Sequence, residues 1–274
     1  MTKKLISYML VFILIILLTS SILCTIMTST ILNEKFTLKI LDKNEYYSKI
    51  YNEIMQNFKN NTIQSGLEDS VLNGIISEEQ VKKDVTELIN SIYENKQIKI
   101  DTESVKTKLQ QNINAVIAEN NKKVSKDEQE EIDAYVNTIA NIYKEGILYA
   151  DEYIPEIQNI VAKLKGIMEK GKPILYIVTI IVAIIILALN RKESIKYFSI
   201  TATSTGLLLI ITKIMEVITM KTQNILILNQ AFSKIVVNII EEIMTKFLVF
   251  GIVFLIIGIA VNLVDSIKLN SSRN

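Results

Sequence analysis

The stretch LISYMLVFILIILL, residues 5–18, follows Lys3 and Lys4 and begins an uncharged run that lasts until Glu34. A secretory signal peptide has an apolar centre of about 7–15 residues and ends at a small-residue cleavage site. This run continues for roughly 28 residues without such an exit, whereas about 20 residues cross a bilayer. It also lacks the small residue that a lipoprotein processing site needs directly before its cysteine, here Cys24. We therefore expect residues 1–32 to form an uncleaved signal-anchor transmembrane helix.

Three further apolar segments complete a predicted four-helix transmembrane bundle. One begins with Pro173, at a first-turn position where the missing N–H costs nothing. Another has Gly251 and Gly258 one heptad apart, a spacing that allows close contact with a neighbouring helix. A third is less apolar, because hydroxyl groups stand near its start and two charged residues near its end. The three predicted spans are residues 173–190, 198–220 and 247–265.

Short charged segments orient the predicted bundle, because cytoplasmic loops favour Lys and Arg. These residues occur before the first span, in the turn 191–197 and in the tail 266–274. With four spans, all three clusters fall on the same side of the membrane. We therefore expect a multi-pass plasma-membrane protein with both termini in the cytoplasm and residues 33–172 outside.

Residues 33–172 predict an extracytoplasmic domain of amphipathic helices. Apolar side chains recur with helical spacing, and strand-like alternation does not last. Two of the helix starts are capping boxes, in which side chains satisfy free backbone N–H groups reciprocally. The fold class is therefore all-α, with a helical bundle inserted between spans one and two. A coiled-coil rod is the lesser alternative, because the apolar stripe resets its phase at every cap. The five helix starts are expected at Asp42, Ser77, Asp101 or Thr102, Ser125 and Pro155.

Residues 221–246 predict an amphipathic helix for which two placements are compatible with the sequence. It packs outside the membrane against residues 155–171, or it lies in the plane of the interface. Interfacial helices favour Lys and Arg on their polar face. This polar face carries Glu241 and Glu242, which favours packing.

Composition limits the chemistry that this 274-residue chain can perform. It has no histidine, one cysteine and a net charge of +1. Without histidine it lacks the commonest general base and metal ligand, and a single cysteine cannot form an internal disulfide. The sequence shows no phosphate-binding loop, nucleophile elbow or metal-ligand spacing. We therefore expect no enzyme activity and no catalytic, cofactor or metal site. The near-zero charge also argues against a nucleic-acid partner.

Lys213 and Glu216 form a candidate intramembrane polar pair in span three. Ionisable residues within a span are costly and often mark an ion or substrate path. Their spacing of three places them on one helix face, where they can pair. The span ends about 10 Å beyond Lys213, so both side chains can also reach the headgroups by snorkelling. Anchoring is the favoured interpretation, with conduction, coupling or an interhelical contact as alternatives.

Hydroxyl groups recur at helical spacing in spans one and three. Small polar residues let membrane helices approach each other and form hydrogen bonds. We expect a contact between these two faces, and a polar lining for a pathway is the alternative. The residues are Ser21, Thr25 and Thr28 in span one, and Thr201 and Thr205 in span three.

Tyrosines recur on the predicted external helices. Tyrosine is enriched in binding surfaces because it combines a large contact area with a polar tip. At helical spacing beside isoleucine, most of these tyrosines are expected at the edge of the core. A partner-binding face is the alternative, and its candidate residues are Tyr46, Tyr143, Tyr149 and Tyr153.

A pattern of helix caps and apolar pairs runs through about the first third of the chain. It comprises Leu41-Asp42, Tyr46-Tyr47, Ser65-Gly66-Leu67, Val71-Leu72, Ile76-Ser77-Glu78-Glu79-Gln80-Val81, Asp84-Val85 and Ile92-Tyr93. The pattern resembles uncharacterised Gram-positive multi-pass membrane proteins in which a helical extracytoplasmic insert follows the first span. The resemblance implies the same topology and brings no activity or site residue.

These observations favour a non-enzymatic bacterial membrane protein whose exported domain binds a partner. The expected partners are the lipid bilayer and a protein, either another chain or a second copy. The predicted cytoplasmic pieces are too short for a signalling output, which favours a scaffold or accessory subunit over a sensor. A small transporter or channel component using span three is the alternative, and a membrane-bound enzyme is a weaker one.

Overall fold

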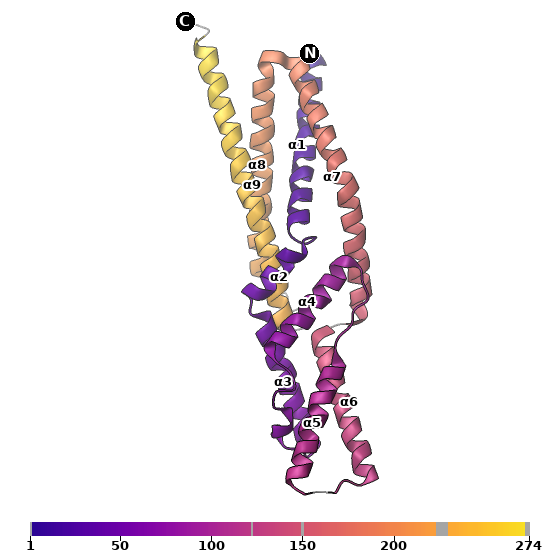
Figure 1. Ribbon diagram of the computed structural model, residues 1–274. Helices are drawn as coiled ribbons and strands as arrows, with labels where there is room; N and C mark the ends of the chain where they lie inside the picture. Colours follow the sequence, from indigo (N-terminus) through magenta and orange to yellow (C-terminus); the bar gives the residue numbers. More distant parts are fainter. Residues whose placement is uncertain (1, 122, 149–150, 223–229, 272–274) are drawn as a thin grey trace. The chain divides into compact units, whose positions relative to one another are not determined.

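The computed structural model describes residues 2–121, 123–148, 151–222 and 230–271 (Figure 1). Every regular element in these ranges is an α-helix or a short 3-10 helix, which confirms the all-α class. The chain divides into two compact units. We name them the four-span unit, Met1–Phe36 with Lys163–Asn274, and the helical insert, Thr37–Ala162. Of the predicted helix 221–246, residues 223–229 lie outside the described ranges.

Four helices are long and apolar enough to cross a membrane, as the sequence predicts. Pro173 lies inside α7, so the helix does not begin at this residue as expected. One missing N–H does not end a helix whose other backbone bonds persist, although it removes a bond from the preceding turn. The four helices are α1 (Thr2–Ser29), α7 (Ile154–Asn190), α8 (Ser194–Thr222) and α9 (Gln230–Ser271).

Charge-free intervals of similar length occur along α7, α8 and α9. The charged residues that bound each interval are 17 or 19 positions apart. At 1.5 Å per residue these intervals span about 26–28 Å, close to the ~30 Å hydrocarbon core of a bilayer. The bounding residues are Lys172 and Arg191, Lys196 and Lys213, and Lys246 and Asp265. Because neighbouring helices run in opposite directions (Figure 1), Lys172, Lys213 and Lys246 mark the same end of the unit.

Two buried clusters hold the four helices together, and α1 contributes to both. The first cluster joins α1, α7 and α8 through Val11, Leu14, Val182, Ile186 and Tyr197. The second cluster joins α1, α8 and α9 through Ile22, Ile26, Leu209, Ile243 and Phe247. Residues 243–247, which include the end of the predicted amphipathic segment, therefore pack against α1 and α8.

Glycines allow α8 and α9 to approach closely, which confirms the contact expected for Gly251 and Gly258. A Cβ atom on Gly258 would lie 2.7 Å from the backbone nitrogen of Thr203. A Cβ atom on Gly206 would lie 2.6 Å from the backbone nitrogen of Leu255. The Ser199 hydroxyl uses this proximity and donates to the Gly258 carbonyl over 2.8 Å. The two helices consequently lie side by side (Figure 1).

The hydroxyl face of α1 contacts α7, so the expected contact with Thr201 and Thr205 was wrong. The Thr25 and Tyr176 hydroxyls lie 2.6 Å apart, and those of Ser21 and Thr179 lie 3.4 Å apart. Lys172 Nζ donates to Thr28 Oγ1 over 3.0 Å. α7 offers matching hydroxyls at the same heights, whereas Thr201 donates within α8 to the backbone of Tyr197.

The helical insert contains the segments between α1 and the start of α7. Its elements are α2 (Glu34–Lys43, whose first turn belongs to the four-span unit), α3 (Tyr46–Gln64), η1 (Asp69–Leu72), α4 (Glu78–Glu94), α5 (Thr102–Glu119), α6 (Lys126–Leu148) and η2 (Asp151–Tyr153). The caps at Ser77, Asp101 and Ser125 are confirmed by side-chain bonds to backbone N–H groups. The start expected at Asp42 was wrong. This residue lies in the last turn of α2, and α3 follows Glu45, which adopts a left-handed conformation.

Large apolar side chains of α3, α5 and α6 fill the core of the insert. Phe58, Leu109 and Ile139 are fully buried. Gly146 on α6 permits close packing, because a Cβ there would lie 2.5 Å from Ile54 Cγ1. The Asn112 side chain bonds the carbonyls of Val71 and Asn73 and thereby ties η1 to α5.

Candidate functional site

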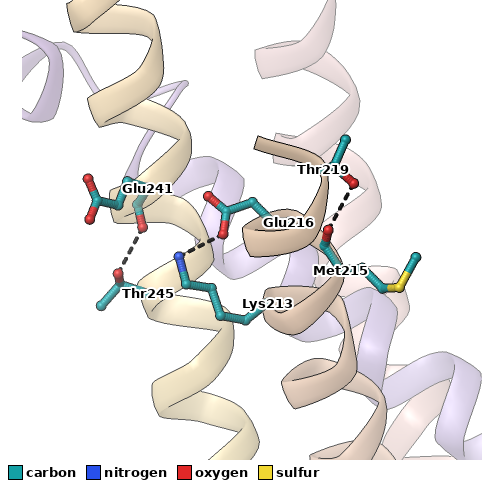
Figure 2. A network of polar contacts seen from close by, with 6 residues as sticks. All are labelled: Lys213, Met215, Glu216, Thr219, Glu241 and Thr245. Carbon is teal, nitrogen blue, oxygen red and sulfur yellow. Dashed lines mark hydrogen bonds and ion pairs between the residues drawn. The ribbon is translucent and has the colours of Figure 1, made fainter. Parts of the chain in front are cut away.

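Lys213 and Glu216 lie one turn apart on α8 and form an ion pair (Figure 2). Lys213 Nζ lies 2.8 Å from Glu216 Oε2, and the side chains expose only 17% and 12% of their surface. Figure 2 shows both side chains extending from α8 towards α9, where Thr245 donates to the Glu241 carbonyl over 2.8 Å. The ammonium and the carboxylate therefore neutralise each other beside α9. They lie at the end of the charge-free interval of α8.

Two other lysines at this end of the four-span unit also contact neighbouring helices. Lys246 Nζ of α9 donates to Ser29 Oγ of α1 over 3.1 Å and lies 5.3 Å from the centre of the Phe36 ring. Lys172 Nζ of α7 bonds Thr28 of α1 and lies 5.8 Å from the centre of the Tyr176 ring. Sequence reasoning missed these two residues. The signal was available, because each lysine bounds a charge-free interval.

The four candidate tyrosines do not form one exposed face. Tyr143 is fully buried, and Tyr46 is also buried and packs edge-on against Tyr47. Tyr153 is 49% exposed, and Tyr149 lies outside the described residues. The alternative of a partner face is therefore wrong for Tyr46 and Tyr143, because a partner cannot contact side chains that the core covers.

Tyr143 instead belongs to a buried polar contact between α6 and α4. Its hydroxyl donates to Asp84 Oδ2 over 2.5 Å. Burial raises the pKa of the Asp84 carboxyl, and the hydrogen bond from Tyr143 partly opposes this shift. Burial and the neighbouring Asp84 carboxylate raise the pKa of the Tyr143 hydroxyl. The sequence signal is Asp84 itself, which stands on the inward face of α4 between Val81 and Val85.

A polar cavity of about 380 Å³ opens beside Asp84. It is lined by the carboxylates of Asp84, Glu87 and Asp101 and by two lysines, Lys83 and Lys99. The opposite charges nearly balance. Among the residues that the structure describes, no three His, Cys, Asp or Glu side chains are placed to hold a metal ion.

A larger groove of about 640 Å³ lies between the C-terminal ends of α3 and α5 and the start of α6. Buried Val71, Ile113 and Tyr135 form its floor, where the Tyr135 hydroxyl lies 2.6 Å from that of Thr62. Burial raises the pKa of the Tyr135 hydroxyl. Half-buried apolar side chains form the walls: Leu67, Val116, Ile117, Val124 and Ile132.

The charged side chains that line this groove are all acidic. They are Glu68, Glu128 and Glu131, and the described lining residues include no Lys or Arg. Glu128 also closes the capping box of α6, because its carboxylate accepts from the Ser125 N–H over 2.8 Å. Sequence reasoning missed the groove, since its walls bring the end of α3 and the segment after it against the ends of α5 and α6, which lie far along the chain from α3. The available signal was Val124, an apolar residue in an otherwise polar linker.

Comparisons of the chain with protein-family models, with curated proteins and with solved structures find no match in any of the three. The function must therefore be argued from the geometry of the described residues.

Proposed function

We propose that this chain is a non-enzymatic membrane scaffold or accessory subunit, in which four spanning helices anchor an extracytoplasmic insert that binds a partner protein. The observation that carries the proposal is the apolar groove with an acidic rim in the insert. Its partner is a protein segment that presents apolar side chains flanked by Lys or Arg.

The size and lining of the groove support this proposal. Pockets that bind ligands or peptide side chains usually measure about 300–1,000 Å³ and have mostly apolar walls. Each apolar side chain that enters such a groove contributes about 1.5–3 kcal/mol before the costs of association are subtracted. The three rim glutamates add a preference for a basic segment, because complementary charge sets specificity and the rate of association.

The groove is also held in shape before a partner arrives. The Tyr135–Thr62 contact fixes the floor, the Asn112 side chain fixes η1, and the capping box fixes the start of α6. A binding surface that is already ordered loses little conformational freedom on association. The contact energy is then available for affinity.

The topology in this proposal rests on the distribution of basic residues. Lys and Arg cluster in the first turn of α1, around the turn between α7 and α8, and after the span of α9. Cytoplasmic placement of these clusters leaves the insert on the outer side.

A purification from native membranes tests the partner. The full chain and the variant Ile132→Glu are extracted in mild detergent, and co-purifying proteins are quantified by mass spectrometry. A near-equimolar protein that decreases about tenfold or more in the variant supports the proposal, because a carboxylate in the apolar wall removes an apolar contact and must be desolvated when the partner's apolar side chains enter. Thr138→Glu is the matched control, since Thr138 is exposed on the same helix and does not line the groove.

Two results would contradict this account. One is the absence of any near-equimolar protein, and the other is equal recovery of the partner with Ile132→Glu and Thr138→Glu. Thermal unfolding in detergent, followed by circular dichroism, shows whether both variants remain folded.

A transport or channel role using α8 is the second candidate, favoured by an ion pair within a candidate span. Its test is ion flux through vesicles that contain the purified chain. Flux in the wild type that disappears in Lys213→Met supports transport. Vesicles that stay tight with the wild type contradict it.

A further inference from the structure

We propose that α1 and α7 form a binding site for the anionic headgroup of a phospholipid at the end of the four-span unit marked by Lys172. The site is a cavity of about 540 Å³ between the two helices. This inference is independent of the groove in the insert, because the cavity residues belong to the four-span unit.

The position of the cavity matches the boundary between headgroups and acyl chains. Lys172 lines the cavity and also ends the charge-free interval of α7. Beyond it, Ile174, Ile177 and Ile180 of α7 are more than half exposed, as expected for side chains that contact acyl chains. A lipid headgroup held at Lys172 would therefore leave its acyl chains along an apolar helix surface.

The lining of the cavity combines lysine ammonium groups with apolar side chains. Lys165 and Lys172 stand two turns apart on the same face of α7, with Met168 between them. Leu32, in the turn that follows α1, adds apolar surface that is itself buried. Such a mixed lining fits an amphiphile whose charged group meets the lysines and whose glycerol and first methylene groups meet the apolar side chains.

Contacts within the four-span unit hold Lys172 in place. Its Nζ donates to Thr28 Oγ1 over 3.0 Å and lies 5.8 Å from the Tyr176 ring centre. An ammonium group has three N–H donors, and the bond to Thr28 uses one of them. Tyr176 is fixed in turn by the 2.6 Å contact with Thr25. A positioned ammonium beside a tyrosine at this depth is suited to a phosphodiester.

The local charge favours an anion although one acid is present. Glu169 also lines the cavity. Residues 163–172 nevertheless contain four lysines and this single acid. Clusters of lysine directly beside a span attract anionic lipids, and basic pockets between spanning helices bind their headgroups. The expected ligand is a phospholipid whose headgroup carries a net negative charge, and the inference holds for either leaflet.

Lipid binding to the full chain tests the site. The purified protein is titrated with phosphatidylglycerol or phosphatidylcholine in detergent, and bound lipid is counted by native mass spectrometry. We expect the wild type to retain phosphatidylglycerol preferentially. Lys165→Gln and Lys172→Gln should each weaken retention about fivefold, in line with the usual contribution of a lysine near a lipid surface.

Lys163→Gln combined with Lys170→Gln is the control, because it removes two charges from the same segment, one more than either test variant, and spares the cavity lining. Retention within twofold of the wild type is expected for this control. An equal loss in the control would overturn the proposal, since it would reveal only diffuse attraction to a basic segment. Equal retention of both lipids by the wild type would also overturn it.

A further titration with inorganic phosphate separates a lipid from a soluble anion. Failure of phosphate to displace the lipid supports the lipid site, because the apolar wall contributes nothing to phosphate binding. Displacement at equal concentrations would overturn the assignment to a lipid. Circular dichroism of every variant confirms that lost binding does not arise from unfolding.

Discussion

The helical insert and the four-span unit are both all-α and both bury large apolar side chains, yet they differ in how closely their helix backbones approach and in the side chains that they expose. In the insert, large side chains such as Phe58 and Leu109 point inward and fill the core. In the four-span unit, small residues such as Gly206 and Gly258 occupy the α8–α9 contact. Most of the exposed large apolar side chains lie on α1, α7, α8 and α9. The comparison indicates that the insert suits water and the four-span unit suits lipid. Burying apolar surface drives association in water and contributes little in lipid.

The comparison is tested most strongly by removing the same kind of apolar bulk from each unit. Leu109→Ala in the insert should lower the free energy of unfolding by about 2–5 kcal/mol, because Leu109 is fully buried and the change leaves a cavity. Ile180→Ala on α7 should change it by less than about 0.5 kcal/mol, since Ile180 is largely exposed. Denaturant unfolding in detergent, followed by circular dichroism, measures both. Similar losses in the two variants would contradict the distinction.

The Lys213–Glu216 pair provides a test of whether two charges in the four-span unit stabilise it as a buried ion pair does. Glu216→Leu should destabilise the unit by about 3 kcal/mol, because it leaves the ammonium of Lys213 without its partner in poorly hydrated surroundings. The double variant Lys213→Met/Glu216→Leu should recover much of this loss. Thermal unfolding of all three variants forms a double-mutant cycle, and strictly additive effects would show that the charges do not interact.

The α8–α9 contact predicts opposite effects for one substitution at two glycines. Gly258→Ala should destabilise the unit by about 1–3 kcal/mol, because its new Cβ meets the backbone of Thr203. Gly166→Ala should stabilise it by about 0.5–1 kcal/mol, since nothing lies within 4 Å and alanine favours the helix. Thermal unfolding in the same detergent compares them. A stabilising effect of Gly258→Ala would contradict the close contact between α8 and α9.

The smallest expected effect concerns Asp84, a buried carboxylate in the core of the insert. Burial raises the pKa of Asp84 in the folded chain above the value of about 3.9 for an unfolded chain. The folded state therefore binds more protons between these two values, and stability should decrease as pH rises through that interval. Asp84→Asn should remove this contribution and slightly raise the melting temperature at pH 7. Unfolding curves between pH 4 and pH 8 provide the measurement, and an unchanged pH profile would contradict the assignment.

Periodic features of the fold could be predicted from the sequence, whereas contacts between distant segments could not. The caps at Ser77, Asp101 and Ser125 depend on neighbours three residues away, and the structure confirms them. The pairing of Thr25 with Tyr176 joins residues 151 positions apart. Apolar periodicity says that a helix face is covered and leaves open which helix covers it.

The candidate site shows the same limit. The spacing of Lys213 and Glu216 was sufficient to expect an ion pair, because both partners lie on one helix turn. The groove required the ends of α3, α5 and α6 to meet, which no local pattern encodes. Tyr143 was misjudged because its polar tip suggested a surface, and its buried partner Asp84 was visible only as an acid on an apolar face.

The bond between Ser199 and the Gly258 carbonyl has a consequence for biosynthesis. α8 is the least apolar of the four candidate spans and emerges from the ribosome before α9. Its hydroxyl groups and charged pair make transfer into lipid alone unfavourable. The Gly258 carbonyl that accepts the hydrogen bond from the Ser199 hydroxyl does not exist until α9 has been synthesised. We therefore expect α8 to remain beside the insertion machinery until α9 arrives, so that the two helices enter the bilayer together.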